Sequence, residues 1–354
     1  MFEIFLIFLF HFFSQISSNQ ISFPFEFINN KHPTINLCLG TPIQCFNFII
    51  TTYMNESFII DGSFYENGFL SNESTSFKLI NNNTKTYYDY MYSRTYFGIV
   101  FNEKVTSKEN NLNINFNFYL VNKGFYTDGN YSGILGLGKT NLHKNNSFLH
   151  ILYKNNLISS KEFYFNNDRI YFGNSMKENV KFLYNKIAKS SNEMYKAKIE
   201  SIIFYNKNNF RLTDSYKKKQ NIFFNPSTEG IICPRKFFVY LRDIIFVQFI
   251  DNINNLCYSQ EYRNYGEIKC DYDIIEKDLG KIYFLFGKWN INFDIKDLFI
   301  EEDIDKINGK KSYKLIFEIF SINYEDIWIF GYPFFKKYDV WFDESNEEIR
   351  VKNK

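Results

Sequence analysis

Apolar and polar residues alternate along much of this 354-residue chain, in short runs separated by Asn, Gly and Asp. Runs of β-branched and aromatic residues with a period of two are typical of strands that bury one face. We therefore expect strands over 113–121, 162–172 and 281–286. Spacings of three and four predict helices over 147–156, after a Ser cap, and over 234–250, with Pro in the first turn. The pattern predicts a mostly-β protein with many short strands.

The same order of motifs occurs twice along the chain. GILGLG (133–138) and WIFGYP (328–333) share an apolar–apolar–Gly core. Each follows, at a distance, a strand that ends in a polar cluster, at 49–52 in the first half and at 223–228 in the second. Two units with the same internal order suggest a duplicated lobe.

Composition excludes several classes of function. The hydrophobic content of 45% is sufficient for a core, so we do not expect a disordered chain. The net charge is +2 and no basic stripe is interleaved with aromatic residues, so nucleic-acid binding is not expected. The four His residues have no ligand spacing with Cys or Asp. We expect neither a metal site nor a cofactor.

The N-terminal segment predicts a signal peptide over 1–18. Residues 4–13 are apolar apart from His11, and small polar residues follow over 14–18. The apolar run is too short to span a bilayer, and no later run of 18 apolar residues exists. We therefore expect secretion and no membrane span after the signal peptide. Glu3 and the missing Lys or Arg weaken this pattern, and an uncleaved anchor is the alternative.

Secretion implies glycans and disulfides. Cys38 and Cys45 flank a Gly-Thr-Pro turn and would face each other across a hairpin, Cys257 and Cys270 would close a short loop, and Cys233 would be left over. Other pairings of the five cysteines stay open. The N-x-S/T glycosylation candidates are Asn55, Asn72, Asn82, Asn130 and Asn145.

Five segments, taken in order, resemble the pepsin-like aspartic proteases. They are LGTPIQCFNFIITTYMNESFII (39–60), SGILGLG (132–138), RIYFGN (169–174), NIFFNPSTEGIICP (221–234) and IWIFGYPFFKKYDVWFDESNEEIRV (327–351). The resemblance covers nearly the whole mature chain. It implies a mostly-β, bilobal fold with two β-barrel-like lobes, 19–180 and 181–354, and a central cleft. It also implies a monomer with a peptide or protein ligand in that cleft.

In this family each lobe donates one aspartate, and the chemistry needs both. Two close carboxylates share one proton, so that one activates a water while the other polarises the scissile carbonyl. The matching positions here are Thr51 and Asn225, and the two loop glycines are replaced by Tyr53 and Ser227. A hydroxyl or an amide cannot replace either carboxylate, so we expect a catalytically inactive protein.

Displaced carboxylates are the alternative. Asp61-Gly62-Ser63 copies an Asp-x-Gly-Ser loop but lies ten residues too late, and we interpret it as a turn after the next strand. Glu229 lies on the wrong side of Thr228. An active aspartic-type endopeptidase with a non-standard site therefore stays the second hypothesis. A decaying gene product without a selected role is the third.

The segment YYDYMYSRTYFGIVF, from Tyr87, resembles the hairpin that closes over substrate in this family. Met91 falls where the flap tyrosine belongs, with Tyr90 and Tyr92 beside it, and the register stays open. A glycan on Asn55 would stand beside the cleft floor, and we expect this position to escape modification. The sequence as a whole predicts a secreted pseudoprotease.

Overall fold

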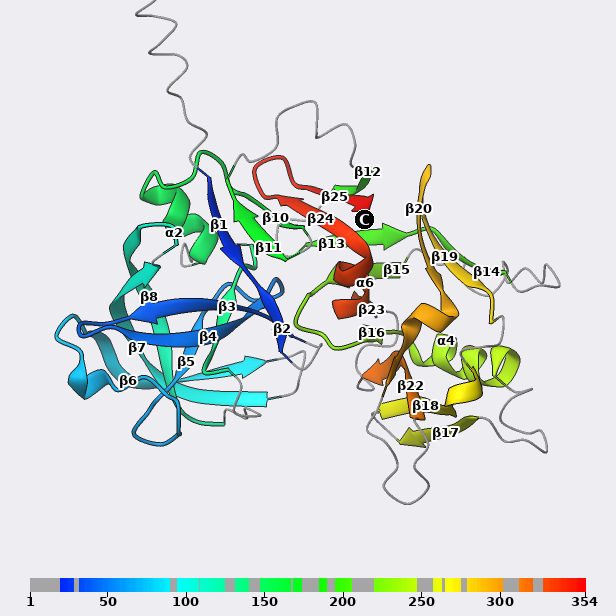
Figure 1. The fold of residues 1–354 in the computed structure, drawn as a ribbon, viewed down its shortest axis with the longest axis horizontal. Coiled ribbons are helices and arrows are strands. Elements are labelled where there is room, and N and C mark those ends of the chain that lie inside the picture. Colours follow the sequence, from blue (N-terminus) through cyan, green and yellow to red (C-terminus); the bar gives the residue numbers. More distant parts are fainter. Residues whose placement is uncertain are drawn as a thin grey trace, which may run out of the picture. The chain divides into compact units, whose positions relative to one another are not determined.

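Strands dominate the structure, a computed structural model in which the helices are short (Figure 1). It describes residues 20–28, 32–89, 94–107, 109–124, 131–139, 147–166, 168–173, 185–189, 195–205, 220–246, 257–262, 265–274, 279–301, 312–320 and 327–354. The predicted mostly-β class is confirmed. Within these ranges, no helix has the length and apolarity needed to cross a membrane. The predicted signal peptide and the flap candidates Tyr90, Met91 and Tyr92 lie outside the described residues.

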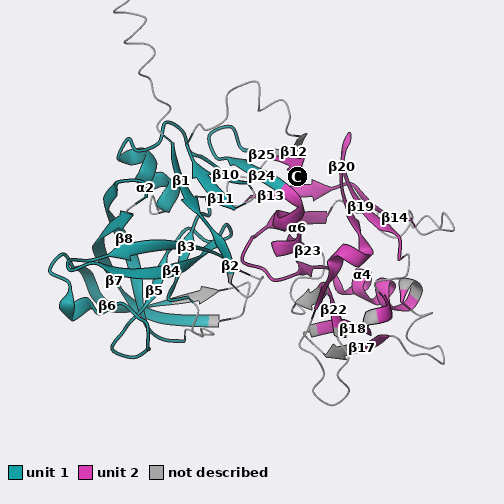
Figure 2. Cartoon of the chain, in the orientation of Figure 1, with its two compact units in different colours: residues 1–28, 33–184, 339–348 teal, residues 29–32, 185–338, 349–354 magenta. Residues whose placement is uncertain are grey.

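The chain divides into two compact units, coloured separately in Figure 2. Unit 1 comprises residues 1–28, 33–184 and 339–348, and unit 2 comprises 29–32, 185–338 and 349–354. A segment near the C-terminus therefore belongs to the first unit. The lobe boundaries expected from the sequence stay a prediction.

Unit 1 is built mainly from two sheets. Its elements are β1 (Ile21–Pro24), β2 (Glu26–Ile28), β3 (His32–Leu39), β4 (Gln44–Thr51), β5 (Phe58–Ile60), η1 (Ser71–Glu73), β6 (Lys78–Asp89), β7 (Arg94–Ser107), β8 (Leu112–Lys123), β9 (Gly133–Gly136), α2 (Phe148–Lys154), β10 (Glu162–Asn166), β11 (Arg169–Phe172) and β24 (Tyr338–Asp343). One sheet has the strand order β2-β3-β4-β9-β5-β8-β7-β6. In the other, β1, β11, β10 and β24 follow one another.

The period-two pattern explains how unit 1 fills its core. Along β8, Leu112, Ile114 and Phe116 are buried, whereas the intervening asparagines are exposed. The Phe118 ring lies 5.8 Å from the ring of Phe48 and 5.8 Å from that of Phe101, centroid to centroid. Each fully buried Phe contributes about 1.5–3 kcal/mol relative to an exposed one. Aromatic packing therefore stabilises the larger sheet of unit 1, in which β4 ends at Thr51.

Two sequence expectations needed correction. The run 162–172 forms two strands, because the chain turns at Asp168, a residue that favours turns, and β10 then pairs with β11 antiparallel. The helix expected over 234–250 is shorter: α4 (Arg235–Tyr240) passes into a π-helical turn, η2 (Leu241–Ile245). Residues 247–250 lie outside the described part.

The helix expected over 147–156 is α2, capped by Ser147, whose Oγ accepts from the His150 N–H at 3.2 Å.

Unit 2 holds an eight-stranded sheet and a three-stranded one. Its elements are β12 (Asn185–Lys189), β13 (Lys196–Ile199), β14 (Ser201–Tyr205), β15 (Gln220–Phe224), β16 (Ile231–Ile232), α4, η2, β17 (Cys257–Tyr262), β18 (Tyr265–Asp271), η3 (Tyr272–Ile274), β19 (Lys281–Phe286), β20 (Trp289–Asp294), η4 (Ile295–Leu298), β21 (Phe299–Glu301), β22 (Ser312–Phe320), β23 (Ile327–Phe330), α6 (Tyr332–Lys337) and β25 (Glu348–Asn353). The larger sheet has the order β13-β15-β23-β16-β22-β18-β17, with β21 on β22. The smaller is β14-β19-β20.

Tyr338, the first residue of β24, belongs to unit 2 and binds β20 there. Its hydroxyl accepts from the Asn292 N–H at 2.9 Å and donates to the Asn292 carbonyl at 2.8 Å. Burial raises the pKa of Tyr338 to about 12, and the hydrogen bond from Asn292 opposes this rise. Because the folded-state pKa exceeds the unfolded value near 10, the neutral phenol stabilises the fold below pH 10, and this contribution is lost as the pH rises from 10 to 12.

Tyr338→Phe is expected to lower the free energy of unfolding at pH 8 by about 1–3 kcal/mol, because both Asn292 backbone groups lose their partner. Between pH 9 and pH 11 the gap between wild type and variant should narrow by about 1 kcal/mol, since only the wild type loses the phenol contribution. Denaturant unfolding at both pH values measures this. Burial lowers the pKa of nearby Lys337, so the contribution of Lys337 to the free energy of unfolding changes with pH in the opposite direction. This contribution is the same in the wild type and the variant. A gap that stays constant with pH would contradict the assignment.

Candidate functional site

The same strand arrangement occurs in both units. In unit 1, β4 runs parallel to β9, and β9 runs antiparallel to β5. In unit 2, β15 runs parallel to β23, and β23 runs antiparallel to β16. The strands β9 and β23 carry the two apolar–apolar–Gly motifs. Each unit thus holds a loop, 51–57 or 225–230, between the first and last strand of such a trio.

The first loop is fixed to the glycine-rich segment after β9. Thr51, the last residue of β4, is buried with 1% of its surface exposed, and its carbonyl accepts from the Leu137 N–H at 2.8 Å. The Gly138 N–H donates to the Met54 carbonyl at 2.7 Å. Ser57 Oγ accepts from the Gly136 N–H at 3.0 Å. Strand and loop therefore form one hydrogen-bonded body.

Gly136 permits this close approach. A Cβ at this position would lie 2.3 Å from the Glu56 carbonyl oxygen, which is far inside van der Waals contact. Gly331 has the same role in unit 2, where a Cβ would lie 2.1 Å from the Thr228 carbonyl oxygen. The glycines of the two repeated motifs are therefore required by backbone contact with the candidate loops.

The second loop encloses the side chain of Asn225, which is completely buried. Its backbone N–H donates to the Phe330 carbonyl at 3.0 Å. Its side-chain Nδ2 donates to Thr228 Oγ1 at 3.1 Å, and its Oδ1 accepts from Ser227 Oγ at 3.0 Å. Both ends of the amide are therefore engaged within the loop.

Neither position offers acid–base chemistry near neutral pH. The Thr51 hydroxyl is not a base, and the Asn225 amide neither accepts nor releases a proton. Asp61 follows β5 and stabilises its own turn, with Oδ1 accepting from the Ser63 N–H at 2.9 Å. The Tyr65 N–H donates to the Asp61 carbonyl at 3.0 Å. These contacts are those of the turn that we expected for residues 61–63.

Sequence reasoning missed two groups beside the loops. Glu56 lies inside the first motif, and after burial its charge is the second cause that raises the pKa of Tyr119. His32, the first residue of β3, belongs to unit 2 and lies beside the second loop. Its Nδ1 donates to the Ser227 carbonyl at 2.9 Å, and its Nε2 lies 3.4 Å from a Glu229 carboxylate oxygen. Glu56 could have been found from the sequence, because it lies within the segment 39–60 that resembles the family motif. His32 carried no signal, because Ser227 is 195 residues away in the sequence.

The cysteine pairs and several sequons can be placed. The structure contains the disulfides Cys38–Cys45 and Cys257–Cys270, and the buried Cys233 belongs to neither. Asn72 and Asn82 are exposed and Asn55 is partly buried, whereas Asn130 and Asn145 lie outside the described residues.

Comparison with known proteins agrees with this geometry. No curated protein matches the chain. The model of the family described as eukaryotic aspartyl protease matches residues 34–353, which include both candidate loops and both glycine motifs. A match over most of the chain, together with the repeated strand arrangement, shows that this protein belongs to the eukaryotic aspartyl protease family.

Proposed function

We propose that this protein is a secreted, catalytically inactive member of the family that binds a peptide or protein segment in the cleft that the family resemblance implies. The observation that carries the proposal is the double replacement at Thr51 and Asn225. Both side chains are buried and lie at matching places in the two units, each next to the end of the first strand of its trio. The secretory location rests on the N-terminal apolar segment and on the two disulfides, which persist in oxidising compartments.

Loss of one carboxylate already removes the shared proton on which the reaction depends. Here both are replaced, and Ser227 adds a side chain where the family has a glycine. The Ser227 hydroxyl donates to Asn225 Oδ1, so the loop is stabilised around the amide. This pattern fits a loop adapted to a neutral side chain.

The binding part of the proposal rests on what the chain keeps. The strand trios, the glycine contacts and the aromatic core are all present, so the scaffold is maintained without the catalyst. An extended peptide can be held through backbone hydrogen bonds and side-chain pockets, which need no catalytic carboxylate.

The purified protein is expected to leave a peptide library uncut at every pH from 2 to 8. An active pepsin-like protease in the same buffers is the positive control, and products are followed by mass spectrometry. A pepstatin-type inhibitor should not raise the melting temperature, because its central hydroxyl needs the carboxylate pair. Cleavage that pepstatin blocks would contradict the proposal.

One observation keeps the endopeptidase alternative open to test. Each candidate loop still contains one carboxylate, Glu56 in the first and Glu229 in the second. Glu229 lies 3.4 Å from His32, which occupies one of its oxygens. If cleavage is found, Glu56→Gln and Glu229→Gln decide the matter: loss of cleavage in both would establish a non-standard site, and retention in both would indicate a contaminating protease.

A further inference from the structure

A groove of about 410 Å³ opens on unit 1, and its lining shares no residue with the loop 51–57. This volume falls within the range of small-molecule sites. Most of its lining residues come from β1, β2 and the β3–β4 hairpin. The lining includes Glu26, Asn36, Cys38, Cys45, Asn47 and Glu109.

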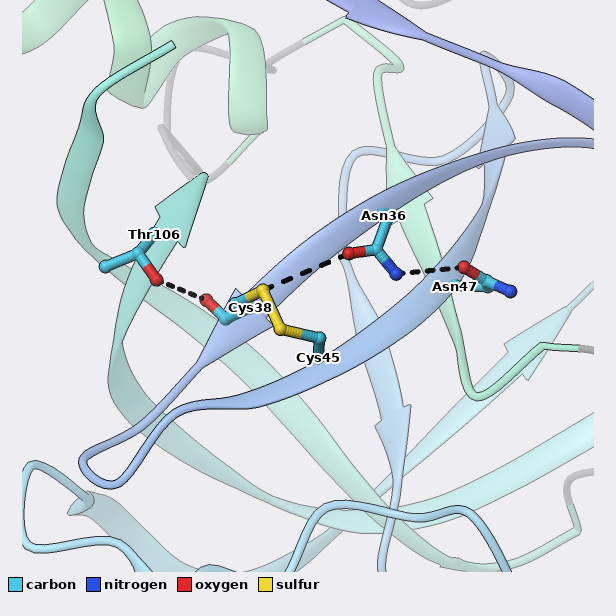
Figure 3. Close-up of a disulfide and its surroundings, with 5 residues drawn as sticks. All are labelled: Asn36, Cys38, Cys45, Asn47 and Thr106. Atoms are coloured by element: carbon cyan, nitrogen blue, oxygen red, sulfur yellow. Dashed lines mark hydrogen bonds between the residues drawn. A yellow bond between two sulfur atoms is a disulfide. The ribbon is translucent and has the colours of Figure 1, made fainter. Parts of the chain in front are cut away.

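Cys38 and Cys45, which form a disulfide (Figure 3), both line this groove. The two cysteines are directly opposite each other on β3 and β4. Cys38 is 5% exposed, whereas Cys45 is exposed. An attacking thiolate needs access to one sulfur of a disulfide, and Cys45, which is exposed and lines the groove, is the cysteine that can offer it.

The second disulfide offers an internal comparison. Cys257 and Cys270 are also directly opposite each other, on β17 and β18. Both are only 2% exposed. The two bonds therefore have the same cross-strand placement and differ in exposure.

The charges of the groove select which thiol can enter. Glu26 is exposed, and no cation among the described residues lies within ion-pair distance of it. Glu109 lies 3.8 Å from the guanidinium of Arg169 and is partly neutralised. Carboxylates repel an ordinary thiolate, but a thiolate that also carries an ammonium group has no net charge and gains attraction from Glu26.

Polar groups beside the bond complete the site. Asn36 Nδ2 donates to Asn47 Oδ1 at 3.1 Å, which fixes the orientation of the Asn36 amide. Asn36 Oδ1 lies 3.9 Å from Cys38 Sγ, as an S···O contact, since a disulfide sulfur carries no proton. The amide oxygen is therefore available to an ammonium or N–H donor at the disulfide.

We propose that this groove is a thiol–disulfide exchange site for small aminothiols. The aminothiol thiolate attacks Sγ of Cys45, the Cys38–Cys45 bond breaks, and Cys38 leaves as a thiolate. A second aminothiol then attacks the sulfur of the first, which releases the aminothiol disulfide and the Cys45 thiolate. Two thiols are oxidised as one protein disulfide is reduced, and the aminothiol disulfide drives the reverse reaction.

Exchange at this bond acts on the strand that leads to the candidate site. The disulfide ties β3 to β4, and β4 ends at Thr51. Opening the bond removes the covalent link of this hairpin while its backbone ladder stays. The proposal does not depend on the absence of proteolysis.

The test uses the full mature protein under native conditions, with cysteamine, 2-mercaptoethanol and 2-mercaptoethanesulfonate as probes. Aliquots are quenched by alkylation, and peptide mass spectrometry follows each disulfide separately. Rates are expressed per thiolate, because the thiols differ in pKa. We expect Cys38–Cys45 to open at least about tenfold faster than Cys257–Cys270, with cysteamine fastest and the sulfonate slowest.

Two variants separate charge selection from exposure alone. Glu26→Gln should reduce the cysteamine-to-sulfonate rate ratio roughly three- to tenfold. Glu66→Gln, at an exposed carboxylate that does not line the groove, should leave the ratio unchanged. Equal opening rates for the two disulfides, or a ratio that Glu26→Gln does not alter, would overturn the proposal.

Discussion

Gly331→Ala is expected to lower the free energy of unfolding by roughly 3–5 kcal/mol or to prevent unit 2 from folding. A Cβ at this position would lie 2.1 Å from the Thr228 carbonyl oxygen and 2.3 Å from that of Gly230. The neighbouring backbone cannot retreat easily, because the Gly331 N–H donates to the Gly230 carbonyl at 3.1 Å. The Tyr332 N–H donates to the Thr228 carbonyl at 2.7 Å. The methyl group would therefore break the contacts that hold the second candidate loop.

Gly287→Ala is the matched control. Gly287 has a φ of +60°, which costs an Ala about 1–2 kcal/mol, but no atom lies within 4 Å of its Cβ position. Chemical denaturation monitored by tryptophan fluorescence suits both variants, because Trp328 lies on β23, the strand that ends directly before Gly331. If Gly331→Ala proved no more harmful than Gly287→Ala, the close approach would be wrong.

Thr51→Asp is expected to cost about 3 kcal/mol or more at pH 7 and less at pH 3. The position is 1% exposed, so a carboxylate there would be ionised in a buried environment. Burial raises the folded-state pKa above the unfolded value near 4. The stability of the variant relative to the wild type is therefore highest below pH 4 and falls as the pH rises above that value. Unfolding curves at pH 3 and pH 7, each compared with the wild type, measure the difference.

Asn225→Asp gives the comparison within the other loop. Its carboxylate can accept hydrogen bonds from both Ser227 Oγ and Thr228 Oγ1, the two hydroxyls that already contact the amide. We expect a cost of about 1 kcal/mol, with little loss between pH 3 and pH 7. The double variant should still not cleave peptides, because we infer that Tyr53 and Ser227 stand where the family has its loop glycines. Equal pH dependence in the two single variants would refute this account of Thr51.

The fold could be read from the sequence where patterns were local. The alternation of apolar and polar residues predicted the strand that is β8, in which Ile114 and Phe116 are buried. It also predicted the strand over 281–286, which is β19. The repeated apolar–apolar–Gly motifs identified the two strands that support the loops, because only glycine fits there. The turn at Asp61 was predicted from the position of this residue directly after an apolar run.

Distant contacts were beyond the sequence. The place of β10 between β11 and β24 depends on pairing of Phe163 with both Phe172 and Phe342, and Phe342 comes from the far end of the chain. The placement of His32 beside Ser227 is equally non-local. Phe occurs 43 times in the chain, so alternation alone could not tell which Phe rings pack against one another. The stacked core of unit 1 shows that many of them pack specifically.

The position of β24 in unit 1 has a consequence for synthesis on the ribosome. Strand β10 pairs with β24 (Figure 1), with Phe163 opposite Phe342. The rings of these two residues stack 4.8 Å apart. At translation rates of about 5–20 residues per second, the second strand follows the first by roughly 10 to 35 s. During that interval one edge of β10 has no native partner, and an uncovered edge can pair with other chains. The nascent chain therefore needs protection until its last residues emerge, and C-terminal truncations should aggregate rather than leave a folded first half.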